Sequence, residues 1–213
     1  MDTRLRNKLV TLAKKRVKND ISHSFDHISR VLRISEKIGR TEKADLDILV
    51  PAALFHDIVV YKGTKNQHKE VDESVKIATN ILKHINEYPQ SKISAVKYAI
   101  SVCSFSKNIT PKTLEAKILQ DADLLEATGA ISIMRTFGSS TVMGSRSFYA
   151  QKDPFSKKRK PNDKLYSLDL FFTRLLIANS RMHTKSAKTI AKRRTAFLHH
   201  FLDELSLELK ESN

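Results

Sequence analysis

The sequence is poor in residues on which several protein classes depend. It has one cysteine, five glycines, five prolines and no tryptophan in 213 residues. A single cysteine, Cys103, excludes an internal disulfide framework and a cysteine-rich zinc ribbon. Glycine and proline (five plus five) make up about 5% of the chain, against an average near 12%. Because turns need these residues, the shortage argues against a fold of many β-strands.

Long hydrophobic runs are also missing. The apolar runs around residues 48–55 and 99–106 are far shorter than the roughly 20 residues of a membrane-spanning helix. The first residues, Met1–Arg6, lack the apolar stretch of a signal peptide. We therefore expect a cytoplasmic protein that does not enter a membrane.

Positive charge, by contrast, is in excess. The chain has 38 lysines and arginines against 23 aspartates and glutamates, a formal charge of +15 and a pI of about 9.9. This balance points to polyanionic partners. The basic clusters at 14–18, 157–160 and 185–194 are modest, and no aromatic residues interleave with them as base-stacking platforms would. The charge therefore fits either the solvated helix faces of a lysine-rich protein or a basic surface for a small phosphate-bearing substrate. Nucleic acid is not favoured, and no oligomeric state is fixed.

Apolar residues recur at helical spacing along most of the chain. Residues 138–167 are different, because glycine, serine and Asp-Pro, Lys-Pro and Asn-Asp pairs gather there, and we expect a long loop region. The sequence predicts an all-α, globular, multi-helix fold in a single domain over residues 1–213. The expected helices cover 5–17, 28–38 (with Gly39 as its stop), 46–56, 71–85, 93–102, 113–137, 168–177 and 185–209.

Histidines and aspartates occur in or at the ends of apolar helical runs. His27 lies on an apolar helix, and His56 and Asp57 end another. Burying such groups unpaired would cost several kcal/mol, so they need partners or an ion. Asp121 and Asp123 lie in a later apolar run and project about 200° apart, so only one of them can face a common site. From the residues alone, a metal site and ordinary hydrogen-bonded core residues both stay open.

The order of these residues resembles a known signature. His27, then His56-Asp57, then Asp123 is similar to the H…HD…D pattern of the HD-domain metal-dependent phosphohydrolases. The likeness to the small stand-alone bacterial HD proteins extends over roughly residues 5–205. It is carried by Ser22–Val31, Phe55–Val59, Ser104-Phe105-Ser106, Glu115–Ala127, Asp153-Pro154-Phe155 and Leu165–Asp169.

The resemblance implies a helical domain that holds one divalent ion, or two in some branches of the family. The ligands that it carries over are His27, His56, Asp57 and Asp123. Asp123 is chosen over Asp121 because the family's last ligand sits in an Ala-Asp-x-Leu context, here residues 122–125. Two imidazoles and two carboxylates suit Mn, Fe, Co, Ni or Zn better than Mg.

The resemblance also implies a hydrolase that uses a metal-activated water on a nucleotide or another small phosphate ester or anhydride. Nucleoside triphosphates cleaved to monophosphate and pyrophosphate are among the substrates that relatives suggest. Asp57 is the expected catalytic residue, because a carboxylate can both hold the ion and orient the water. Arg30, Lys62 and Lys65 are the expected substrate-binding residues, because positive side chains can neutralise charge on phosphate oxygens.

Three positions depart from the family pattern. Ser24 stands where relatives commonly carry Asp, Cys103 where a His is usual, and Leu124 where Arg is usual. None of them removes an expected ligand. Two alternatives therefore stay open: a degenerate HD scaffold that binds metal or nucleotide without turnover, and a basic helical nucleic-acid-binding protein.

Overall fold

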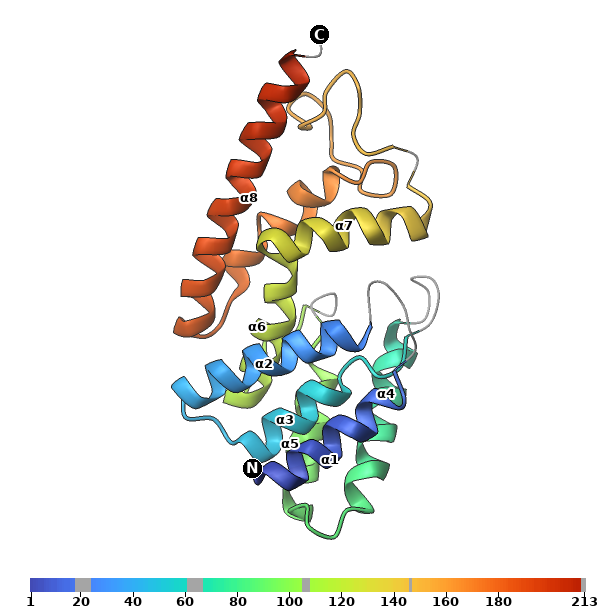
Figure 1. Cartoon of the computed structure of the whole chain (residues 1–213), viewed down its shortest axis with the longest axis vertical. Helices are drawn as coiled ribbons and strands as arrows, with labels where there is room; N and C mark the ends of the chain where they lie inside the picture. Colours follow the sequence, from blue (N-terminus) through green and yellow to red (C-terminus); the bar gives the residue numbers. More distant parts are fainter. Residues whose placement is uncertain (18–23, 61–66, 105–107, 146, 212–213) are drawn as a thin grey trace. The chain divides into compact units, whose positions relative to one another are not determined.

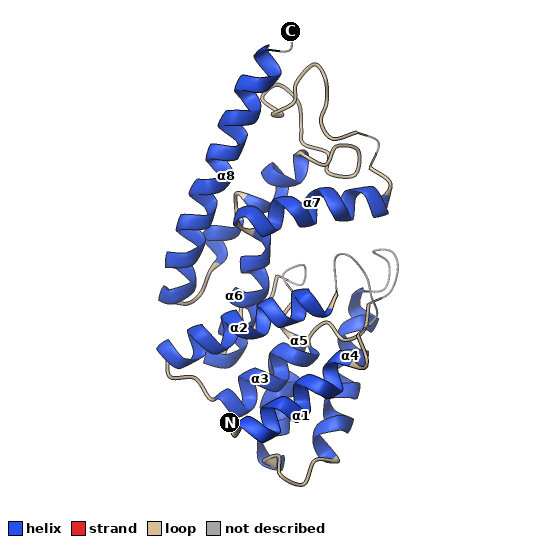
Figure 2. Cartoon of the chain, in the orientation of Figure 1, coloured by secondary structure: helices blue, strands red, loops and turns tan. Residues whose placement is uncertain are grey.

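The computed structural model describes the whole chain apart from residues 18–23, 61–66, 105–107, 146 and 212–213. The described residues form helices and loops with no strand, and their one isolated β-bridge joins Ser147 to Tyr166 (Figure 2). The predicted all-α fold is therefore confirmed. The chain divides into two compact units, Met1–Asp123 and Leu124–Asn213, so the single domain stays a prediction and each unit is described separately.

No helix in the described parts of the chain has both the length and the apolarity to cross a membrane.

The first unit contains the helices that carry the histidine and aspartate motifs. The helices of this unit are α1 (Thr3–Lys14), α2 (Phe25–Thr41), α3 (Leu46–Phe55), α4 (Gln67–Lys83), the short 3-10 helix η2 (Gln90–Lys92), α5 (Ile93–Ser101) and α6 (Leu114–Leu124).

Helix α3 is the centre of the first unit. It packs against α1, α2, α4 and α5, as its place among these helices in Figure 1 shows. Residues 49–55 are all buried, Pro51 among them, which explains a sequence that is apolar on every face. Asp45 caps the helix by accepting a hydrogen bond from the Asp47 backbone N–H at 2.9 Å. This buried helix delivers His56 and Asp57 at its carboxyl end.

Gly39 does not end its helix, and the prediction that it is a stop is wrong. Helix α2 continues to Thr41, with Glu42 as its C-cap. A Cβ at position 39 would lie 2.6 Å from Leu49 Cδ2, so any larger residue there requires the Leu49 side chain of α3 to move. The left-handed residue that follows the helix is Lys43, with φ of 59°.

The long helix predicted over 113–137 is also wrong. Helix α6 ends at Leu124, the 3-10 helix η4 (Leu125–Ala127) follows, and α7 (Gly129–Met143) starts anew. Thr128 is extended and donates its hydroxyl to the Leu125 carbonyl at 2.6 Å, while Gly129 has φ of 71°. The Arg194 side chain fills the space next to Gly129 and donates to the same carbonyl at 2.9 Å. These side-chain bonds replace the helical ones.

The loop predicted over 138–167 begins six residues later than expected. Helix α7 runs on to Met143 and stops at Gly144, which is left-handed with φ of 79°. The Ser145 N–H donates to the Ser140 carbonyl at 2.9 Å, the bond that typically closes a glycine-ended helix. A glycine therefore ends this helix, at position 144.

A buried carboxylate organises the loop that follows. Asp169 is completely buried and accepts two hydrogen bonds from the Arg159 guanidinium, at 2.5 and 2.7 Å. It also accepts from the Asn162 backbone N–H at 2.5 Å and from the Ser156 hydroxyl at 3.0 Å. Burial opposes ionisation, but these donors outweigh it and hold the pKa of Asp169 below its usual value. The Asp169 carboxylate thus holds residues 156–162 in place, although this segment has no helix or strand.

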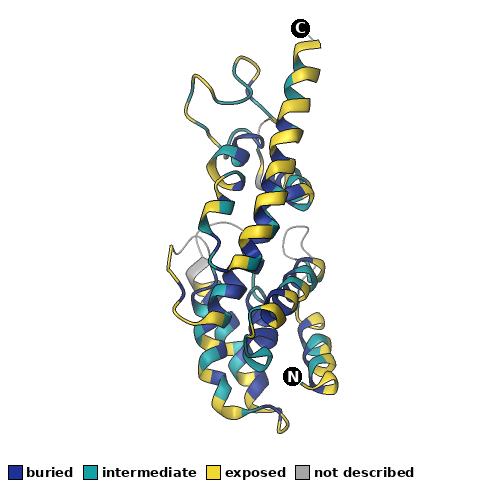
Figure 3. Cartoon of the chain, turned by 90° about the vertical axis from the view of Figure 1, so that its left-hand side faces the viewer, coloured by how far each residue is buried: buried dark blue, intermediate teal, exposed yellow. Residues whose placement is uncertain are grey.

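The rest of the second unit is a small helical core. The predicted helix over 168–177 is a π-helical turn, η5 (Phe171–Leu175), which the 3-10 helix η6 (Ala178–Arg181) follows. Helix α8 (Lys185–Glu211) ends the unit, and Figure 3 shows its exposed surface interrupted by a buried stripe. The buried core of the unit is formed by Leu168, Phe171, Leu175, Leu198 and Leu202.

Candidate metal centre

His27 enters the centre from the first turn of α2. Ser24 is the N-cap residue of this helix, although its side chain makes no cap hydrogen bond. His27 is 1% exposed and is followed by the fully buried Ile28. The His27 ring thus lies on the buried, apolar side of α2.

His56 and Asp57 enter from the carboxyl end of α3. His56 is the C-cap residue, and its Nδ1 lies 2.9 Å from the Ala53 carbonyl oxygen. A carbonyl can only accept, so Nδ1 carries a hydrogen, and in the neutral ring Nε2 keeps its lone pair. The Ala53 carbonyl therefore orients the ring with Nε2 available to the site.

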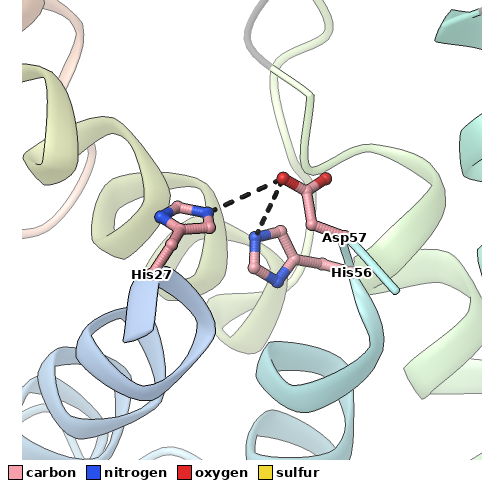
Figure 4. A group of neighbouring side chains, drawn as sticks. All are labelled: His27, His56 and Asp57. Atoms are coloured by element: carbon pink, nitrogen blue, oxygen red, sulfur yellow. Dashed lines mark ion pairs between the residues drawn. The ribbon is translucent and has the colours of Figure 1, made fainter. Parts of the chain in front are cut away.

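Asp123, on the last turn of α6, completes a group of four. His27 Nε2 lies 3.6 Å from Asp57 Oδ2 and 3.5 Å from Asp123 Oδ1. His56 Nε2 lies 3.9 Å and 3.8 Å from the same two oxygens. In Figure 4 both rings face one carboxylate oxygen of Asp57, while its other oxygen points away from them. Four side chains from three helices thus converge.

The centre has a buried and an open side. The side chains of His27 and His56 are 1% and 2% exposed, whereas those of Asp57 and Asp123 are 34% and 24% exposed. Solvent or a substrate therefore reaches the carboxylates first, and the imidazoles lie on the buried side of the centre.

The carboxylates control the protonation of the buried histidine rings. Burial lowers the pKa of His56, but Asp57, Asp123 and the Ala53 carbonyl outweigh it and raise that pKa to about 9. Burial likewise raises the pKa of Asp123, but the two histidines outweigh it and the pKa is lowered. Without an ion, a proton on His56 therefore offsets the charge of the two carboxylates.

The four residues fit a divalent transition-metal ion. His56 Nε2 is buried with no hydrogen-bond partner in the part of the chain that the structure describes, which is costly unless something binds there. Ligands about 2.1 Å from one ion lie about 3.0–3.4 Å apart at octahedral and tetrahedral angles. The observed separations of 3.5–3.9 Å are only slightly wider. The ligand roles themselves stay a proposal.

Cys103 and Gln120 complete the surroundings. The Cys103 thiol is 3% exposed, and burial, with the nearby carboxylates of Asp123 and Asp57, raises its pKa well above the usual value. Gln120 was missed by the sequence analysis. Its side-chain amide donates to the carbonyls of Val102 at 2.9 Å and Ile109 at 3.2 Å, which ties the segment after α5 to α6. A glutamine on a helix gives no sequence signal of such a contact.

The expected substrate-binding residues are only partly described. Arg30 lies half-buried on α2, three residues after His27 and so on the same side of the helix. Lys62 and Lys65 lie outside the described residues. Asp121, the alternative to Asp123, is completely buried.

Comparisons with known proteins agree with this architecture. The HD domain family model matches residues 24–128. Bacillus subtilis YpgQ is 28% identical over 193 residues, which are 88% of this chain and 84% of that protein. The crystal structure of YpgQ in complex with ADP matches with a TM-score of 0.73 and 26% identity, over 96% of this chain and 95% of that one.

Two further solved structures extend the likeness. The Lin1889 protein from Listeria innocua is 30% identical, with a TM-score of 0.70 and coverage of 99% of this chain and 98% of that chain. An HD-superfamily hydrolase from Bacillus thuringiensis is 27% identical, with a TM-score of 0.73 and 97% coverage of each chain. With the H…HD…D residues gathered at one site, these matches lead to one conclusion: the chain belongs to the HD-domain family of hydrolases.

Proposed function

We propose that this hydrolase is a metal-dependent phosphohydrolase that acts on a nucleotide or another small phosphate ester or anhydride. The observation that carries the proposal is that the Nε2 atom of each of two buried imidazoles lies 3.5–3.9 Å from an oxygen of each of two reachable carboxylates. Nitrogen and oxygen donors in this ratio favour Mn, Fe, Co, Ni or Zn over Mg. When bound, such an ion polarises a phosphoryl oxygen and acidifies a water in the site.

Asp57 is the proposed catalytic residue. It lies past the end of α3 and is the most exposed of the four side chains, so its carboxylate can meet both the site and an incoming water. One of its oxygens faces the two histidine rings and the other points away from them (Figure 4). This arrangement suits a group that helps to hold an ion with one oxygen and accepts a hydrogen bond from water with the other.

His27, His56 and Asp123 are proposed to bind the ion and keep it in a fixed position. The buried imidazoles present fixed nitrogen atoms, because His56 is oriented by the Ala53 carbonyl and both rings are enclosed by the core. A fixed set of ligands avoids reorganisation during the reaction, which is where much of the electrostatic contribution to catalysis originates.

The substrate is proposed to be a nucleotide. The charge of +15 favours a phosphate-bearing ligand, and YpgQ, with which this chain shares its fold, has been solved with ADP. Arg30, on the same helix as His27, is the proposed phosphate contact, together with Lys62 and Lys65. Cleavage of a nucleoside triphosphate to monophosphate and pyrophosphate is the specific reaction to test first.

The test combines metal analysis of the purified protein with release of phosphate and pyrophosphate from a nucleotide panel, with Mn or Co added. We expect about one bound ion per chain and turnover that Asp57→Ala removes. Metal binding without turnover on any nucleotide would favour a degenerate scaffold. Salt-sensitive binding to DNA or RNA with no bound metal would favour the nucleic-acid-binding alternative.

A further inference from the structure

Cys103 lies beside the proposed ligands. A ring nitrogen of His56, the sulfur of Cys103 and a carboxylate oxygen of Asp123 all lie within 4.8 Å of one another. The same histidine belongs to the group that it forms with His27 and Asp57. The thiol therefore lies beside His56 and Asp123, two of the four proposed ligands.

The position of this thiol is fixed by the fold. Cys103 follows the end of α5, and its backbone N–H donates to the Ile100 carbonyl at 3.2 Å. Gln120 donates to the Val102 carbonyl at 2.9 Å, and it lies three residues before Asp123 on α6, on the same side of that helix. The contact that ties Cys103 to α6 is thus one turn away from the Asp123 carboxylate.

A second observation points to a ligand at this place. The buried His56 Nε2 has no hydrogen-bond partner among the described residues, and its nearest carboxylate oxygens are 3.8 and 3.9 Å away. We propose that Cys103 is a further ligand of the ion at this centre, and that its sulfur makes the centre prefer a thiophilic ion, above all zinc, over manganese. This rests on the proposed function, because it needs an ion at the four residues.

The geometry and chemistry allow the bond. With four other ligands the site would be five-coordinate. With zinc–sulfur bonds of about 2.3 Å and nitrogen or oxygen bonds of about 2.0–2.2 Å, sulfur then lies about 3.1–3.8 Å from neighbours at angles of about 90–120°. The 4.8 Å limit on the three atoms exceeds these separations by at most about 1.0–1.7 Å, and rotation about the single χ1 bond of cysteine moves only the sulfur. A coordinating thiol loses its proton, here to solvent, and thiolate selects Zn over Mn.

The experiment uses the fact that Cys103 is the chain's one cysteine. The full chain is freed of metal and titrated with Co²⁺, whose visible bands report binding of the ion and whose near-ultraviolet sulfur-to-cobalt band reports a thiolate ligand. We expect both signals. Cys103→Ser should keep the visible bands and lose the ultraviolet band, while Val102→Ala, a packing change next to the thiol, should keep both.

Metal competition provides the second measurement. Cys103→Ser should weaken zinc affinity by at least about tenfold, since even indirect partners of a metal are worth 10–100-fold, and should change manganese affinity by less than about threefold. Visible cobalt bands with no ultraviolet band in the native chain would overturn the sulfur ligand and leave the metal centre standing. No cobalt binding at all would overturn the metal centre and this proposal with it. If Cys103→Ser does not fold, the spectrum of the native chain still decides.

Discussion

The affinity of the centre for a divalent ion should rise steeply with pH, because binding must displace a proton from His56. In the metal-free protein the carboxylates of Asp57 and Asp123 raise the pKa of His56 to about 9. A protonated imidazole has no lone pair for a metal. At pH 7, two units below that pKa, about one molecule in 100 carries a neutral His56, which reduces the binding free energy by roughly 3 kcal/mol.

The assay is competition with a chromophoric chelator whose own pH dependence is known. It is best made in Cys103→Ser, so that the thiol contributes no proton. The apparent affinity should rise about 50-fold between pH 7 and pH 9. Histidines with the usual pKa near 6.5 are already largely neutral in this range and add little slope. An affinity that stays flat would refute the reasoning, because His56 would then be neutral before the ion arrives.

The same proton stabilises the metal-free fold. Because the pKa of His56 is raised on folding, its contribution to stability is fully present below about pH 6.5 and is lost as the pH rises through about 9. A shift of about 2.5 units corresponds to roughly 3 kcal/mol. The difference in unfolding free energy between the native chain and His56→Gln should therefore shrink by about this amount from pH 6 to pH 9. A difference independent of pH would contradict the raised pKa.

Three further changes have defined outcomes. Asp57→Ala should abolish hydrolysis and leave the circular dichroism spectrum helical, because the side chain lies past a helix end and is 34% exposed; global unfolding would make the site chiefly structural. Arg159→Met should cost roughly 3–5 kcal/mol in urea unfolding, because it leaves the buried Asp169 without its cation. The matched control Lys157→Met, exposed in the same loop, should cost less than about 0.5 kcal/mol, and equal losses would refute the role of the pair. Gly39→Ala should cost about 1–2 kcal/mol in total. Displacing the buried Leu49 Cδ2, 2.6 Å from the new Cβ, costs about 1–3 kcal/mol, and the better helix propensity of alanine offsets up to about 1 kcal/mol; an unchanged or raised unfolding midpoint would show that Leu49 moves aside at no cost.

Helix periodicity predicted most of the fold because most helices bury one face. The apolar run 46–56 identified α3, which is buried on all sides, and only its length separated it from a strand. The predicted helix 113–137 failed because its break at Thr128 and Gly129 depends on Arg194, a residue 65 positions later than Gly129. Local propensity carries no information about such a partner.

The site residues were within reach of sequence reasoning, but their arrangement was not. Polar residues on apolar helices singled out His27, His56 and Asp57, and the resemblance selected Asp123. The orienting bond from His56 to the Ala53 carbonyl and the closeness of Cys103 arise from how chain segments meet in space. Backbone carbonyls and tertiary contacts leave no pattern in the sequence, so these features needed the structure.

The most direct test of the metal centre is an anomalous difference map from crystals of the full chain grown with Mn²⁺ or Co²⁺. We predict one strong peak within about 2.0–2.3 Å of His27 Nε2, His56 Nε2 and a carboxylate oxygen from each of Asp57 and Asp123. A peak at any other place, or none among these four side chains with the metal in excess, would contradict the account.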